Sequence, residues 1–237
     1  MSASDPDFLF PPPPRASLAV LGDARRFPVR RIFCVGQNYA AHAREMGREM
    51  GTDPSREAPC FFSKPADAVV ASGTTIPYPP RTSDLHHEIE LVAAIGSGGA
   101  DIARADALAH VFGYAAGIDL TRRDLQSEAR KAGRPWDLSK GFDNSAPLGS
   151  IAPAERVGHP GKGRIRLAVN GATRQDADLS DMIWSVAEIV AILSQFVRLE
   201  AGDLIFTGTP AGVGPIVSGD HVTGEIEGVG TVELTVA

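Results

Sequence analysis

The chain has 237 residues and a net charge of −6, with 43% hydrophobic and 22% charged residues, as is ordinary for one large globular domain. It has no basic block typical of nucleic-acid binding, no apolar stretch near the ~20 residues of a membrane span, and no signal-peptide pattern. Two cysteines, Cys34 and Cys60, are too few for a disulfide framework. We therefore expect a cytoplasmic protein without nucleic-acid or membrane partners.

In chain order, the predicted elements of the first half are short strands and helices without regular alternation. A polyproline run at Pro11 to Pro14 is expected to be extended and at the surface. After it we predict a strand at 31–35, a helix at 38–50, a strand at 60–63, a β-like segment at 85–95, a helical segment at 104–112 and a buried strand at 113–118. Thr121 with Asp124 resembles a capping box, for a helix that Gly133 and Pro135 would end.

The second half is dominated by strands and turns. Residues 164–169 predict a strand that Asn170-Gly171 turns into a hairpin, and 203–236 read as strand and turn throughout. Residues 185–197 carry apolar side chains at helical spacing and predict an amphipathic helix. Together with 25 glycines and 18 prolines, this irregular mixture indicates an α+β fold rich in β structure.

The segment His86-His87-Glu88-Ile89-Glu90-Leu91 carries the strongest chemical signal. Side chains alternate along a strand, so Glu88 and Glu90 point the same way while Ile89 points to the apolar side. Two carboxylates side by side repel each other, and a cation between them would relieve that repulsion if they are buried. The alternative is a solvated strand face with two ordinary glutamates.

A third acid, Asp119, ends the apolar run FGYAAGI, where a carboxylate is costly unless paired. Its alternative role is a helix cap. Three carboxylates and no cysteine favour a hard cation such as Mg²⁺, Mn²⁺ or Ca²⁺ over zinc. His86 shares the strand parity of the glutamates and could support them, although a packed or surface histidine is the favoured interpretation.

Five segments in order resemble the fumarylacetoacetate hydrolase family: RIFCVGQNYAAHAREM, HHEIEL, GYAAGIDLTRRDLQ, PWDLSKGFDNSAPLG and FTGTPAGVG. The resemblance covers about residues 28–236 and is closest to the short, single-domain acylpyruvases. It implies a mixed, β-rich fold with layered sheets, like the C-terminal domain of that family. It also implies an extended segment at 1–27 before a single catalytic domain at 28–237, assembly as a homodimer, and Mg²⁺ or Mn²⁺ held by Glu88, Glu90 and Asp119.

The resemblance further implies a hydrolase that cleaves the C–C bond of an acylpyruvate, a small 2-oxo acid. The expected reaction is conversion of 3-fumarylpyruvate to fumarate and pyruvate in gentisate-type aromatic degradation. His42 and Glu45 lie three apart on a predicted helix, and a histidine oriented by a carboxylate can take a proton from water. From the residues alone, an ordinary solvated pair is the favoured interpretation, but the resemblance implies that this position is catalytic. The same holds for Lys140, which could stabilise developing negative charge.

Substrate binding is expected from Arg123, Gln126 and Thr209. Helical spacing would bring Arg123 and Gln126 to the face with the metal-bound substrate, and Thr209 could donate its hydroxyl or backbone N–H. The alternative for Arg123 and Gln126 is exposure at the surface, and the alternative for Thr209 is a turn that ends a strand. The sequence does not rank the arginines that could bind a distal carboxylate, for which the candidates are Arg44, Arg48 and Arg56.

Two other functions stay open at this stage. A metal-dependent isomerase or decarboxylase, acting on 2-hydroxy-dienedioates or oxaloacetate, would use the same three acids. A non-catalytic metal-binding or interaction protein is the third hypothesis. The presence of His42, Glu45 and Lys140 together with the acids argues against it.

Overall fold

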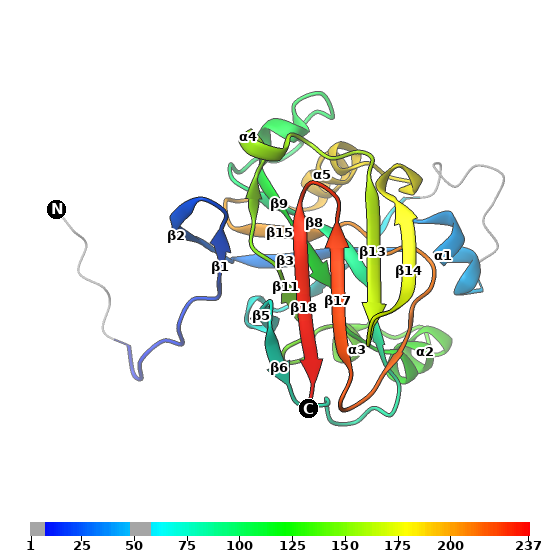
Figure 1. The fold of residues 1–237 in the computed structure, drawn as a ribbon. Coiled ribbons are helices and arrows are strands. Elements are labelled where there is room, and N and C mark those ends of the chain that lie inside the picture. Colours follow the sequence, from blue (N-terminus) through cyan, green and yellow to red (C-terminus); the bar gives the residue numbers. More distant parts are fainter. Residues whose placement is uncertain (1–7, 48–57) are drawn as a thin grey trace.

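A curved central sheet organises the molecule (Figure 1). The computed structural model describes residues 8–47 and 58–237. The central sheet has eight strands, seven in the order β4-β3-β15-β8-β9-β11-β5, with β12 pairing separately with β9. Their bounds are β3 (Arg31–Gly36), β4 (Cys60–Lys64), β5 (Val69–Ala71), β8 (Ile89–Ile95), β9 (Val111–Ile118), β11 (Ala146–Leu148), β12 (Ala152–Pro153) and β15 (Asp203–Phe206).

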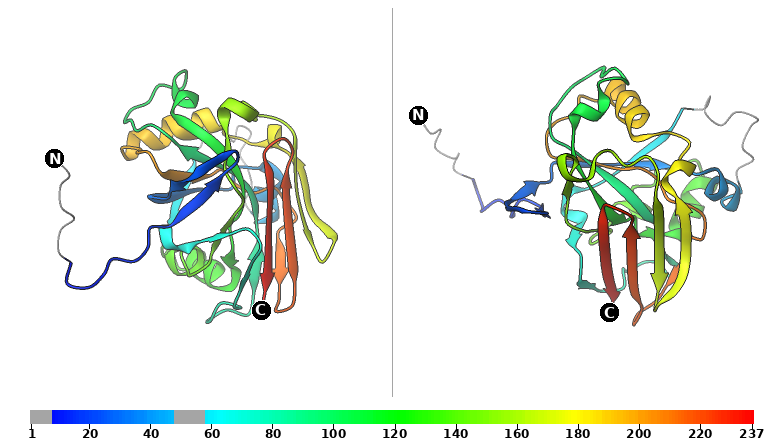
Figure 2. Two further views of the ribbon diagram at one scale, coloured as in Figure 1. Left: turned by 60° about the vertical axis from the view of Figure 1, so that its left-hand side comes forward. Right: turned by 45° about the horizontal axis from the view of Figure 1, so that its top comes forward.

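A second sheet packs against one face of the first and encloses the main hydrophobic core. Its order is β14-β13-β17-β18-β6, with bounds β6 (Thr74–Ile76), β13 (Arg164–Val169), β14 (Ala172–Asp178), β17 (His221–Ile226) and β18 (Gly230–Val236). Figure 2 shows this layer in orange, red and yellow beside the central sheet. Leu91 on β8 and Leu167 on β13 are among the fully buried side chains between the layers. The β-rich layered α+β fold expected from the sequence is therefore confirmed.

The opposite face of the central sheet carries a second, smaller core. The hairpin of β1 (Ser17–Val20) and β2 (Asp23–Pro28) places Leu18 and Phe27 in the same cluster as Val92 and Phe206. This hairpin falls almost wholly in the segment 1–27 that was expected to be extended, and alternate apolar side chains pack it against the sheet. Residues 8–16 run away from the body as an extended arm that contains the exposed polyproline run (Figure 1).

Both faces of β8 are thus buried, which explains its continuous apolar sequence. Ile89 and Leu91 face the main core, whereas Val92 and Ala94 face the smaller one. Glu90 shares the parity of Val92, so its side chain points to the smaller-core side of the sheet. The site described below lies on that side, beyond the last apolar side chains.

The remaining elements gather at the two ends of the sheets (Figure 1). A short sheet of order β10-β7-β16 is formed by β7 (Leu85–His87), β10 (Thr121–Arg122) and β16 (Gly214–Ile216). The α-helices are α1 (Ala40–Glu45), α2 (Arg123–Lys131), α3 (Asp137–Lys140), α4 (Ala154–Val157) and α5 (Val186–Phe196), with 3₁₀ turns η2 (Ala66–Ala68), η3 (Ala107–His110) and η4 (Leu179–Asp181). No helix in the described ranges is long and apolar enough to cross a membrane.

Three features predicted from the sequence differ in the structure, and β1, β2, β5, β6, β11, β12, α3 and α4 were not predicted. The helix predicted at 38–50 ends at Glu45, with Gly47 at a φ of 71° just beyond it; residues 48–50 lie outside the described part. The segment 104–112 forms only a 3₁₀ turn, because β9 begins at Val111.

The proposed Thr121–Asp124 capping box is wrong, because Thr121 belongs to β10 and α2 begins at Arg123 without a side-chain cap. Asp124 instead accepts hydrogen bonds from the Thr82 hydroxyl at 2.7 Å and the Ser83 N–H at 3.0 Å.

Candidate active site

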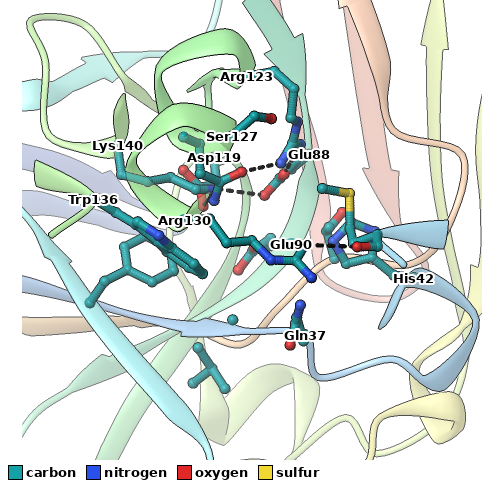
Figure 3. A pocket seen from close by; sticks show the side chains of 16 residues that line it. Gln37, His42, Glu88, Glu90, Asp119, Arg123, Ser127, Arg130, Trp136 and Lys140 are labelled. Carbon is teal, nitrogen blue, oxygen red and sulfur yellow. Dashed lines mark hydrogen bonds and ion pairs between the residues drawn. The ribbon is translucent and has the colours of Figure 1, made fainter. Parts of the chain in front are cut away.

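A pocket opens where α1, α2 and α3 meet the ends of β8 and β9 (Figure 3). It contains all three acids at its base. Its wall is formed by Val35, Gly36, Gln37, His42, Met46, Phe62, Arg123, Gln126, Ser127, Arg130, Trp136, Lys140 and Thr209. Of the predicted site residues, Glu45 alone does not line the pocket; it lies behind His42.

Pairing of β8 with β9 brings the three acids together. Ile89 is opposite Ile118, and the backbone N–H of Asp119 donates to the carbonyl of Glu88 at 2.8 Å. One carboxylate oxygen from each of Glu88, Glu90 and Asp119 lies within 4.8 Å of the others, and all three residues are buried. The strand parity inferred from the sequence therefore holds, even though Glu88 falls between β7 and β8.

Two buried lysines balance part of this negative charge. The Lys140 ammonium donates to Glu88 Oε2 at 2.8 Å, to Asp119 Oδ2 at 2.7 Å and to Thr121 Oγ1 at 2.7 Å. Burial alone would lower the pKa of Lys140, but the carboxylates of Asp119 and Glu88 raise it above its ordinary value. Lys64, at the end of β4, lies 2.8 Å from the other oxygen of Asp119 and donates to the carbonyls of Leu120 and Lys140.

Glu88 and Glu90 differ in electrostatic environment. Burial would raise the pKa of Glu88, but Lys140 and Arg123 together hold that pKa well below its usual range. Burial, reinforced by the charges of Asp119 and Glu88, raises the pKa of Glu90 well above its usual range. In the described part of the chain no lysine or arginine forms an ion pair with Glu90, which accepts the Gly208 N–H at 2.7 Å. A divalent cation among the three oxygens would supply the missing positive charge, so the donor set fits Mg²⁺ or Mn²⁺.

His42 and Glu45 form a hydrogen-bonded pair on α1, and His42 lines the pocket (Figure 3). His42 is buried, and its Nδ1 lies 3.1 Å from Glu45 Oε2. Burial opposes ionisation of Glu45, but the hydrogen bonds from His42 and the Gly212 N–H lower its pKa overall. Because Nδ1 is engaged by the carboxylate, Nε2 is the ring nitrogen left for a molecule in the pocket.

Arg123 connects α2 to the acids. Its guanidinium donates to Glu88 Oε1, to Gln126 Oε1 and, at 3.3 Å, to His86 Nδ1. The other ring nitrogen of His86 lies 3.0 Å from Asp84 Oδ1. His86 is half-buried and accepts from the arginine that contacts Glu88, which is the supporting role that the sequence analysis gave as the less favoured alternative.

The loop after β15 brings Thr209 against β8. The Thr209 hydroxyl donates to the carbonyl of Ile89 at 2.8 Å and accepts from Gln175 Nε2 at 2.8 Å. The hydroxyl proton is thus used within the protein. Of the two substrate donors proposed from the sequence, the backbone N–H of Thr209 is the one that remains. Gly208 has a φ of 98°, and an added Cβ would lie 2.6 Å from that of Asn38, so glycine is required here.

The residues of the site that the sequence analysis missed include Lys64, Gln175, Ser127 and Arg130. Ser127 and Arg130 follow Arg123 at helical spacing, which was a usable signal. Lys64 and Gln175 come from other strands and left no local signal. Arg44, a candidate for the distal carboxylate, is exposed and does not line the pocket, whereas Arg48 and Arg56 lie outside the described residues.

A family model described as the C-terminal domain of fumarylacetoacetate (FAA) hydrolase matches residues 31–237. The chain belongs to the fumarylacetoacetate hydrolase family. This confirms the resemblance inferred from the sequence segments.

Among curated relatives, this family member is 46% identical over 191 residues to a fumarylpyruvate hydrolase of Ralstonia sp., covering 81% of the chain and 98% of the relative. It is 40% identical over 207 residues to the mitochondrial oxaloacetate tautomerase FAHD1 of Mus musculus, covering 87% of the chain and 91% of the relative. The crystal structure of fumarylpyruvate hydrolase from Pseudomonas aeruginosa in complex with Mn²⁺ and pyruvate superposes with a TM-score of 0.93 and 53% identity, covering 98% of this chain and 99% of that one.

Proposed function

We propose that this protein is a metal-dependent hydrolase that cleaves the C–C bond of an acylpyruvate, with 3-fumarylpyruvate as substrate and fumarate and pyruvate as products. One observation carries the proposal. A buried triad of carboxylates shares a pocket with a histidine that a glutamate orients. The 46% identity to a fumarylpyruvate hydrolase supports the choice of substrate.

Glu88, Glu90 and Asp119 would hold the metal, Mg²⁺ or Mn²⁺. The neighbouring structure from Pseudomonas aeruginosa, in complex with Mn²⁺ and pyruvate, supports this assignment. When bound, the ion supplies Lewis-acid polarisation of the 2-oxo group of the substrate. Arg123, Gln126 and the Thr209 N–H would orient the adjacent carboxylate, since they surround the acids in the pocket.

His42, oriented by Glu45, acts as the general base. It takes a proton from a water molecule, and the resulting hydroxide attacks the distal ketone of the substrate. The bond between that carbonyl carbon and the neighbouring CH₂ then breaks, and the electron pair stays with the pyruvate half as its enolate. The acyl half leaves as fumarate, and protonation of the enolate carbon gives pyruvate. Lys140 contributes a fixed positive charge beside the carboxylates while negative charge develops on the pyruvate half.

A substrate panel tests the proposal. Purified protein with Mg²⁺ or Mn²⁺ is given fumarylpyruvate, acetylpyruvate and oxaloacetate, while loss of enol absorbance and release of pyruvate are followed. We expect turnover of the two acylpyruvates that stops in excess chelator. Loss of CO₂ from oxaloacetate without turnover of either acylpyruvate would contradict it.

A second candidate function is a tautomerase, isomerase or decarboxylase acting on oxaloacetate or a related 2-oxo acid. It is favoured by the 40% identity to oxaloacetate tautomerases. Enol–keto exchange of oxaloacetate, without C–C cleavage of acylpyruvates, would support it. Homodimer assembly, a cytoplasmic location and a role in gentisate-type degradation stay predictions; light scattering of the purified protein tests the first.

A further inference from the structure

One positively charged residue that lines the pocket, Arg130, has no role in the function proposed above. Arg123, Ser127 and Arg130 follow one face of α2, at spacings of four and three residues. At 1.5 Å per residue, Arg130 lies about 10 Å farther along the helix than Arg123. In Figure 3 its side chain reaches across the pocket above Gln37.

The two arginines of this helix face differ in charge balance. Arg123 is neutralised by Glu88 and bonded to Gln126. Arg130 donates through Nη1 to the backbone carbonyl of Met46 at 2.7 Å. Among the described residues no carboxylate forms an ion pair with Arg130, and the other N–H groups of its guanidinium are further donors.

We infer that Arg130 is the binding residue for the terminal carboxylate of the substrate, opposite the end that the acids hold. The inference rests on the proposed acylpyruvate chemistry. The seven-carbon chain of fumarylpyruvate contains six bonds of about 1.5 Å and spans roughly 7–8 Å when extended. The length of the extended substrate plus one hydrogen bond of about 2.8 Å at its far end matches the rise of about 10 Å along α2 between Arg123 and Arg130.

This subsite also gives the pocket a length and shape preference. The trans double bond of the fumaryl group holds its terminal carboxylate extended, toward Arg130. A cis double bond would turn that carboxylate away from the helix axis, so the maleyl isomer should bind less well. Acetylpyruvate has no terminal carboxylate, so its binding and turnover should not depend on Arg130.

The experiment compares Arg130→Gln with Arg130→Lys and with Arg44→Gln, an exposed arginine on α1 outside the pocket. For Arg130→Gln we expect kcat/KM on fumarylpyruvate to fall about 10- to 50-fold, mainly through KM, with acetylpyruvate changed less than twofold. Arg130→Lys should recover part of the loss, and Arg44→Gln should behave as the parent protein.

Equal losses on both substrates would overturn the inference, because they would show that Arg130 only positions α1 through its bond to Met46. The absence of any loss on fumarylpyruvate would overturn it as well. Calorimetric binding of the two acylpyruvates to the Mn²⁺-loaded parent and to Arg130→Gln measures the same difference without turnover. A protein that binds fumarylpyruvate through Arg130 but hydrolyses neither compound would contradict the proposed function and leave the subsite standing.

Discussion

Replacing Gln175 by leucine should destabilise the protein and loosen the loop that carries Thr209. Gln175 lies on β14 and has no exposed surface. Its Oε1 accepts from the Ile89 N–H at 3.1 Å and lies 3.1 Å from His87 Nδ1. Its Nε2 donates to Thr209 Oγ1 at 2.8 Å and to the Pro210 carbonyl at 2.9 Å. One amide therefore joins β7, β8, β14 and the loop at the floor of the site.

The magnitude follows from the groups that leucine would leave without a partner. The Thr209 hydroxyl keeps its bond to Ile89, but the Ile89 N–H and the Pro210 carbonyl would be buried and unsatisfied. Each such group costs about 1–3 kcal/mol, and the apolar side chain offsets little of this. We expect a loss of about 3–5 kcal/mol in the free energy of unfolding, a large part of the 5–15 kcal/mol typical of a domain.

Urea denaturation followed by circular dichroism measures this loss, with Thr173→Leu, an exposed position on the same strand, as the control. The control should change the free energy of unfolding by less than about 0.5 kcal/mol. Metal affinity should also fall in Gln175→Leu, because the Gly208 N–H that contacts Glu90 belongs to the same loop. A change below 1 kcal/mol at an unchanged denaturant slope would refute the reasoning.

Three further changes test other parts of the structure. His42→Gln should lower kcat on acylpyruvates about 100- to 1,000-fold while Mn²⁺ affinity is kept, and retention of full turnover would exclude His42 as the base. Glu88→Ala should abolish Mn²⁺ binding in calorimetry, whereas Glu128→Gln, an exposed position on α2, should leave it unchanged. Ser185→Ala removes the capping box with Glu188 at the start of α5 and should cost about 1 kcal/mol in thermal or urea unfolding; an unaltered midpoint would contradict this.

Local patterns in the sequence predicted several elements because a short window contains their whole signal. The apolar spacing of 185–197 predicted α5, and Asn170-Gly171 predicted the hairpin of β13 and β14. Alternation on a strand placed Glu88 and Glu90 on one face. The helix cap at Thr121 was wrong because its hydroxyl donates to Asp119 O and accepts from Lys140, which are tertiary constraints.

By itself, the sequence determined the strands that carry the three acids, the amphipathic helix and the acidic character of the site, since side-chain periodicity acts over a few neighbouring residues. Only the tertiary structure decided that Asp119 lies opposite Glu88, that Lys64 neutralises it, and that Gln175 supports Thr209. These contacts depend on strand register and on how both faces of β8 are buried. They join residues separated by tens of positions along the chain, and no local preference encodes such distances.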